Sequence, residues 1–365
     1  MSYERPEFGT GKTQNGVFAF GNLEVQMPVF ESPISPKENF YRSARRDHPL
    51  WVPFPAVDTQ ELHMFNLATE GPEGCQLGPN LCAKQDRYVY HDAFGNSWTF
   101  DKAAGGACMT IGTRVCDDIL KWEDQVHFPD FHEWNMEETA KDFMENRYAP
   151  ERALHIDIYH GPFQALSDLL GGFAEALEAM FVEPEASGAF FDRFADWYIW
   201  LIDKLSALYP VDMFTAHDDW GTEKDTFFSQ GMLDELLYEP TKRIIDHVHG
   251  MGKIYQFHNC GRVERFMPTL CDLGPELVQL QRRVNDTPKY KELYGDRVGF
   301  NTGLENLVPG KAYTDEELTR IVRESVDIFG EGGGFLPAVY GGSPEMLWKI
   351  YSELYCYSRE YYEKA

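Results

Sequence analysis

Basic residues are scarce in this chain, which carries 33 Lys+Arg against 59 Asp+Glu and a formal net charge of -26 at pH 7. Affinity for nucleic acids and for anionic membrane surfaces comes mainly from Lys and Arg beside phosphates. The charge balance therefore argues against both kinds of partner. Long apolar runs are also missing: no window approaches 18 consecutive apolar residues, and no apolar segment follows a basic start. We therefore predict neither a membrane span nor a signal peptide.

Cysteine and phosphate-binding loops are the other notable shortages. The 7 cysteines are odd in number and spread thinly, without the clustering of a disulfide framework, so we predict a reducing, cytoplasmic setting. The pairs Cys75/Cys82 and Cys108/Cys116 have no companion CxxC and do not indicate a zinc knuckle. No GxGxxG or GxxxxGK[ST] loop is present, which weakens an open nucleotide-binding fold.

Apolar material is plentiful, with 43% hydrophobic and 15% aromatic residues, and its pattern predicts an α/β protein. Strand-like segments alternate with helical ones, as in parallel βαβ units. We predict a single (β/α)₈ barrel over 36–365 with an insertion around 70–150, preceded by an extended arm over 1–35; an open doubly wound sheet is the alternative. The predicted strands lie near 51–57, 106–111, 153–159, 275–281 and 297–303, and within the segments 211–221, 253–261 and 333–342, the first of which runs into a polar loop. The predicted helices include 163–181, 184–208, 229–250, 314–329 and 343–362.

Polar residues recur at the carboxyl ends of these strands, where a barrel places its catalytic residues. They are His217, Asp218, Asp219, His258, Cys260, Gln281, Asn301 and Tyr340. This repeated position predicts one active site at the barrel mouth.

Two short motifs indicate its chemistry. His258 and Cys260, in an H-x-C arrangement after a strand, offer two good zinc ligands; the alternative is a buried histidine beside a small packed cysteine. Asp218 and Asp219 can act as a general acid and an ionised partner. Alternatively, one aspartate caps a turn while the other is solvated, and Trp220 is plain packing.

The segments RSARRDHPLWVP, VYHDAFGNSW, DDWGTEKDTFFS and YQFHNCGRV, in that order, resemble the uroporphyrinogen decarboxylase superfamily. The resemblance implies a (β/α)₈ barrel and covers most of 36–350. The arginine-rich RxRPP signature of the decarboxylases is missing. HNC resembles the H-x-C zinc pair of corrinoid methyltransferases, and GTGKTQNGVFAFGN looks like the N-terminal arm of the methyltransferase component of anaerobic O-demethylases.

The resemblance implies transfer of a methyl group from an aryl methyl ether, such as vanillate or veratrole, to cob(I)alamin on a separate corrinoid protein. It implies zinc as a cofactor, bound by His258 and Cys260. The catalytic residues that we predict are Asp219 and His258, either of which can serve as the general acid if zinc is not bound. The coenzyme M branch has a third ligand, a Cys, near its last strand, where this chain has FLPAVYGG. Asp219 or Glu305 would then complete the set formed with His258 and Cys260. The residues expected to contact substrate are His217, Trp220, Gln281 and Tyr340.

Two other functions remain open at this point. One is decarboxylation of a porphyrinogen or a smaller aromatic acid, and the other is a non-catalytic barrel that binds a corrinoid or an aromatic ligand. The tyrosines of the last predicted helix are interpreted as a packing seam, with a homodimer surface as the alternative.

Overall fold

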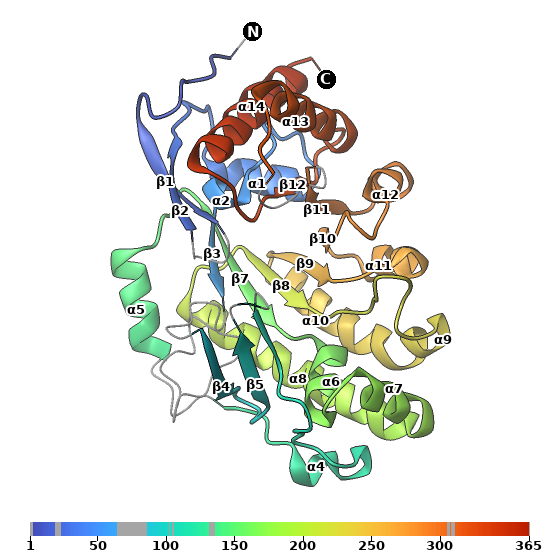
Figure 1. Ribbon diagram of the computed structural model, residues 1–365. Coiled ribbons are helices and arrows are strands. Elements are labelled where there is room, and N and C mark those ends of the chain that lie inside the picture. The colour runs from blue at the N-terminus through green and yellow to red at the C-terminus, as the bar shows by residue number, and fades with distance from the viewer. Residues whose placement is uncertain are drawn as a thin grey trace. The chain divides into compact units, whose positions relative to one another are not determined.

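Figure 1 shows a computed structural model of the chain. The structure describes residues 3–18, 23–63, 86–101, 103, 106–130, 136–304, 307 and 311–364. The chain divides into two compact units. Unit 1 contains Met1–Glu61, Ala149–His155 and Met267–Ala365, and unit 2 contains Leu62–Tyr148 and Ile156–Phe266.

The largest sheet has seven strands in the order β12-β11-β10-β9-β8-β7-β3. The pairs β8–β9, β10–β11 and β11–β12 are parallel. This strand order and the helices between the strands confirm the α/β barrel class, although the described residues give this sheet seven strands and not eight. The strands are β3 (Thr59–His63), β7 (Ala153–Tyr159), β8 (Met213–His217), β9 (Ile254–Asn259), β10 (Leu277–Leu280), β11 (Gly299–Gly303) and β12 (Phe335–Ala338).

Unit 1 contains an antiparallel hairpin and six of the described helices. The hairpin pairs β1 (Thr13–Phe18) with β2 (Leu23–Pro28). The helices are α1 (Pro36–Ala44), α2 (Pro55–Asp58), α11 (Met267–Leu273), α12 (Thr287–Tyr294), α13 (Asp315–Phe329) and α14 (Pro344–Tyr362). The predicted starts of α13 and α14 are confirmed, because Thr314 forms a capping box with Glu317 and the Ser343 side chain accepts from Met346 N.

The first residues of the chain are fastened to α14, the red helix of Figure 1. Arg5 Nε lies 2.7 Å from Glu353 Oε2, and Trp348 Nε1 donates to the carbonyl of Pro6 over 3.0 Å. Phe30 stacks on Tyr355 with ring centroids 4.2 Å apart. Tyr355 and Tyr351 are both buried, so this part of the predicted tyrosine seam is internal packing.

Unit 2 combines a three-stranded antiparallel sheet with helical segments that lie before β7 and after β7, β8 and β9 in the chain. The sheet is β4 (Arg87–His91), β5 (Ser97–Asp101) and β6 (Gly106–Met109). Phe94, in the turn between β4 and β5, lies 4.9 Å from the Trp197 ring and thereby contacts α8. The helical segments are η3 (Ile119–Lys121), α4 (Trp122–Gln125), α5 (Met136–Asn146), α6 (Pro162–Leu170), α7 (Phe173–Val182), α8 (Pro184–Leu208), α9 (Gln230–Met232), the π turn η4 (Leu233–Leu237), α10 (Tyr238–Gly250) and η5 (Glu264–Phe266).

Two predicted barrel strands are wrong. The apolar run over 51–57 leads into α2, because Pro55 suits a first helical turn and the Asp58 carboxylate accepts from Phe54 N. The barrel strand β3 begins only at Thr59. The segment predicted over 106–111 forms β6, which pairs antiparallel with β5 and belongs to the smaller sheet.

One predicted helix is also wrong in its length. The segment 163–181 is two helices, α6 and α7, separated at Gly171 and Gly172. Gly171 has φ 95° and Gly172 has φ 156°, a backbone geometry that glycine adopts easily and that ends a helix. Among the helices in the described ranges, none combines the length and apolarity needed to cross a bilayer.

Candidate metal centre

The site forms where β8 and β9 end side by side in unit 2. The two strands run parallel with His217 opposite His258. Their imidazole rings therefore extend to the same face of the sheet and stack, with centroids 3.9 Å apart and planes at 24°. The chain then continues from β8 to Asp219 and from β9 to Cys260. Alternation along paired strands thus brings three residues of the two sequence motifs to one place.

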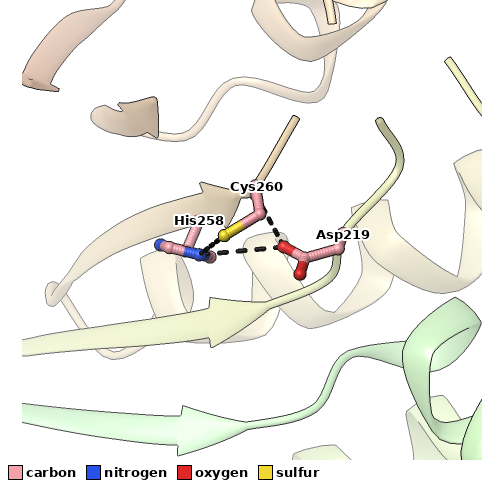
Figure 2. Close-up of side chains that lie close together, drawn as sticks. All are labelled: Asp219, His258 and Cys260. Atoms are coloured by element: carbon pink, nitrogen blue, oxygen red, sulfur yellow. Dashed lines mark hydrogen bonds and ion pairs between the residues drawn. The ribbon is translucent and has the colours of Figure 1, made fainter. Parts of the chain in front are cut away.

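Asp219, His258 and Cys260 form the core of the site, and Figure 2 shows their side chains converging. His258 Nε2 lies 3.3 Å from Cys260 Sγ and 3.7 Å from Asp219 Oδ1. The three ligand atoms all lie within 4.8 Å of one another. The side chain of His258 is 13% exposed and that of Asp219 is 29% exposed, so the cluster is shielded and still reachable from solvent.

This donor set fits a zinc ion. Zinc binds imidazole nitrogen at ~2.0 Å, thiolate sulfur at ~2.3 Å and carboxylate oxygen at ~2.1 Å in tetrahedral geometry. Tetrahedral angles at those lengths place ligand atoms ~3.4–3.6 Å apart. The two distances from His258 Nε2, 3.3 and 3.7 Å, bracket this range. Three protein ligands leave a fourth position for substrate, as in catalytic zinc sites.

The thiol of Cys260 is held in its protonated form while no metal is bound. Burial and the Asp219 carboxylate raise the pKa of Cys260 to about 12. A metal cation reverses this preference, because a coordinating thiol is deprotonated. Metal binding by Cys260 would therefore release a proton.

Buried backbone contacts fix the loop that carries Cys260. The Asn259 side chain has no exposed surface; its Oδ1 accepts from Trp220 N over 2.6 Å and its Nδ2 donates to the Gly261 carbonyl over 3.1 Å. Cys260 N donates to Asp219 Oδ1 over 2.6 Å. A Cβ on Gly261, whose φ is +80°, would lie 2.1 Å from the Gly221 carbonyl oxygen. The loops after β8 and β9 therefore fit together only with glycine at this contact.

The two adjacent aspartates have different surroundings. Asp218 is buried, and its carboxylate accepts from Gln164 N in the first turn of α6 over 2.9 Å and from Trp220 Nε1 over 2.8 Å. Burial raises the pKa of Asp218 to about 7, and these donors oppose that rise. Asp218 thus caps a helix and holds Trp220, whereas Asp219 faces the metal centre. Trp220 has no exposed surface and packs against Phe257, so it supports the loop; its contact with substrate stays a prediction.

Sequence reasoning did not identify the partner of His217. His217 Nε2 lies 2.6 Å from Asp157 Oδ1, and Asp157 is buried on β7. The signal in the sequence was Asp157 itself, a charged residue inside the mostly apolar strand ALHIDIY, which indicates a buried partner. This hydrogen bond holds one edge of the His217 ring, and one face of the ring stacks on His258.

The remaining predicted residues lie outside this cluster. Gln281 follows β10, Asn301 is buried on β11, and Tyr340 follows β12 and is 54% exposed; all three belong to unit 1. Glu305 lies outside the described residues. The substrate contacts of Gln281 and Tyr340, and a metal-ligand role for Glu305, stay predictions.

Comparisons with known proteins agree with the barrel. The sequence pattern of the family described as uroporphyrinogen decarboxylase (URO-D) matches residues 143–340, more than half of the chain. A methyltransferase from Methanosarcina mazei has a similar structure, with a TM-score of 0.58 at 14% identity, covering 90% of this chain and 94% of that chain. A B12-independent methionine synthase from Shewanella sp. W3-18-1, in complex with selenomethionine, gives a TM-score of 0.43 at 12% identity, covering 79% and 76%. No curated protein matches the sequence. At 14% identity, the similarity to the Methanosarcina mazei methyltransferase shows a shared fold and nothing more.

Proposed function

The chain belongs to the uroporphyrinogen decarboxylase family, and from this premise we propose that it is a methyltransferase that moves a methyl group from an aryl methyl ether to cob(I)alamin carried by a partner corrinoid protein. The observation that carries the proposal is the convergence of Asp219, His258 and Cys260, with all three ligand atoms within 4.8 Å. A nitrogen, a sulfur and an oxygen ligand suit zinc. The missing RxRPP signature counts against the porphyrinogen decarboxylases.

In the proposed reaction the bond between the ether oxygen and the methyl carbon breaks. Cobalt(I) supplies the electron pair of the new carbon–cobalt bond, and the aryloxide leaves with the pair of the broken bond and takes up a proton. Expulsion of the aryloxide is the difficult step. Zinc bound at the centre would supply a Lewis acid for the ether oxygen.

The chain's own residues position these groups. Asp219, His258 and Cys260 hold the metal, and Asn259 fixes the loop between them. His217, oriented by Asp157 and stacked on His258, forms the wall against which we place the aromatic ring. Should the centre work without metal, His258 or Asp219 would protonate the leaving oxygen, a contribution of roughly 10²–10⁴-fold.

The test combines metal analysis with an anaerobic assay. Purified wild type should contain one zinc per chain and release a phenol from a panel of methoxyarenes only when reduced cobalamin is present, with methylcobalamin as the second product. Cys260→Ser should lose most of the zinc and at least about 10-fold in rate, because losing even a residue that only hydrogen-bonds to a metal ligand costs about 10–100-fold. Cys116→Ser, a buried cysteine of the same unit that hydrogen-bonds only to the backbone among the described residues, should change neither. Phenol release without a corrinoid would indicate hydrolysis, and CO₂ release from an aromatic acid would indicate decarboxylation; either result refutes the proposal.

A further inference from the structure

Unit 2 contains a small cavity apart from the metal centre. Its volume is about 20 Å³, and its wall includes Asp92, Phe94, Asn96, His160, Asp168 and Trp197. A single water requires roughly 10–15 Å³ by this measure, so the cavity has room for a molecule of one or two heavy atoms. The β4–β5 turn forms one side, and the end of β7 with α6 and α8 forms the other.

On the turn side, a buried acceptor has no donor. Asp92 Oδ2 accepts from Asn96 Nδ2 over 2.9 Å, which fixes the orientation of the Asn96 amide with its nitrogen toward Asp92. The opposite atom, Asn96 Oδ1, is buried and receives no hydrogen bond from any residue within the described ranges. Asn96 as a whole is 4% exposed. A buried acceptor without a hydrogen bond destabilises the folded state. A molecule with hydrogen-bond donors in the cavity would remove this cost.

On the barrel side, the cavity is negatively charged. Asp168 is 1% exposed, and its Oδ2 lies 2.5 Å from His160 Nδ1. His160 has φ 83°, a strained backbone for a bulky residue that surrounding contacts must hold in place. Burial alone would lower the pKa of His160, but the Asp168 and Asp92 carboxylates outweigh it and raise that pKa. Even with His160 protonated, two carboxylates face one positive charge, and the described residues that line the cavity include neither lysine nor arginine.

The rest of the wall is aromatic and aliphatic. Phe94 lies 6.2 Å from the Phe194 ring and 4.9 Å from the Trp197 ring, and Ile158 and Leu201 complete the apolar side. Aromatic faces attract cations when these are desolvated. Calcium and magnesium ions take six or more oxygen ligands, which a mostly hydrocarbon wall does not offer. A nitrogen cation with N–H donors matches both sides of the cavity.

We propose that this cavity binds one small nitrogen cation, either ammonium or methylammonium. Its N–H groups donate to Asn96 Oδ1 and to the Asp168 carboxylate, and its positive charge faces the aromatic rings. The bound ion joins the β4–β5 turn to the end of β7. This site is independent of the proposed methyl transfer.

Thermal unfolding of the full chain tests the proposal. Ammonium chloride, methylammonium chloride, potassium chloride and tetramethylammonium chloride are compared at equal ionic strength. A ligand at ten times its dissociation constant should raise the midpoint by about 2 °C. We expect a saturable rise with ammonium, with methylammonium or with both, and the responding salt identifies the ion. An equal rise in all four salts, or no rise in any, would overturn the proposal and leave water as the occupant.

Two variants locate the effect. Asn96→Leu removes the acceptor, and Ala165→Val fills the cavity, which Ala165 lines, while all polar groups remain. Both should abolish the ammonium response. Asn285→Leu, an equally buried asparagine (4% exposed) of unit 1, should keep it. A response that survives in either cavity variant contradicts the assignment; if Asn96→Leu does not fold, Ala165→Val decides.

Discussion

Replacing Asn259 by alanine should damage both the stability of the protein and its metal centre. The side chain is fully buried and satisfies Trp220 N and the Gly261 carbonyl. Each buried group left without a partner costs about 1–3 kcal/mol. Two such groups predict a loss of about 4 kcal/mol in the free energy of unfolding. Because the same contacts fix the loop of Cys260, zinc affinity should fall by about 10–100-fold, as for other outer-shell partners of metal sites.

Asn39 provides the matched control. It is also fully buried, its Nδ2 donates to the Trp51 carbonyl over 2.9 Å, and its Oδ1 accepts from Leu50 N over 2.7 Å. Asn39→Ala should therefore lose a similar amount of stability and keep its zinc. Urea unfolding measures the first quantity, and competition with a chromogenic chelator measures the second. Equal zinc affinity in the two variants would show that Asn259 does not fix the Cys260 loop for metal binding. A loss below about 1 kcal/mol in the free energy of unfolding of Asn259→Ala would show that its two buried hydrogen bonds contribute little to stability.

Two further predictions concern a buried acid and a glycine. Burial raises the pKa of Asp58 from 3.8 to about 6, so the protonated carboxyl favours the folded state. Stability is therefore lost as the pH rises from 4 through 6, and a pKa change of about two units corresponds to about 3 kcal/mol. Urea unfolding should show that the stability of Asp58→Asn relative to wild type increases by about this amount between pH 4 and pH 7, and a constant difference would contradict the shift. Gly261→Ala should lose at least about 2 kcal/mol and its zinc, because strain at positive φ adds to the clash with Gly221. Gly252 also has a positive φ, +72°, but a Cβ there would have nothing within 4 Å. Gly252→Ala should therefore lose only about 1 kcal/mol in the free energy of unfolding. Similar losses in the two glycine variants would show that the clash at Gly261 has no effect.

Local signals in the sequence predicted much of the fold. Helices are predicted to start at Ser229, Thr314 and Ser343, and in the structure the side chain of each of these residues caps a helix. The apolar run over 51–57 was misassigned because burial alone does not distinguish a strand from a packed turn. Pro53 and Pro55 were the contrary signal, and the Asp58 contacts that settle it depend on the folded turn.

The site was predictable to the extent that it follows strand ends. His258, Cys260 and Asp219 come together because paired parallel strands end at one edge. The separate tasks of Asp218 and Asp219 could not be assigned from sequence, since they depend on the first turn of α6. Asp157 was not identified because its partner His217 is 60 positions away in the chain. Asn96 and His160 were not identified because the cavity that they line is formed by segments that are distant in sequence.

The attachment of the first residues to α14 has a consequence for synthesis on the ribosome. Arg5 and Glu353 are 348 positions apart in the chain, so the N-terminal segment emerges long before its partner exists. Unit 1 also needs residues from three separate stretches, whereas the last residue of unit 2 is Phe266. We therefore expect unit 2 to fold first during translation. The N-terminal segment then has no contact with α14 until that helix has left the ribosome. For that interval, we expect Phe30 and its apolar neighbours to be exposed and available to chaperones.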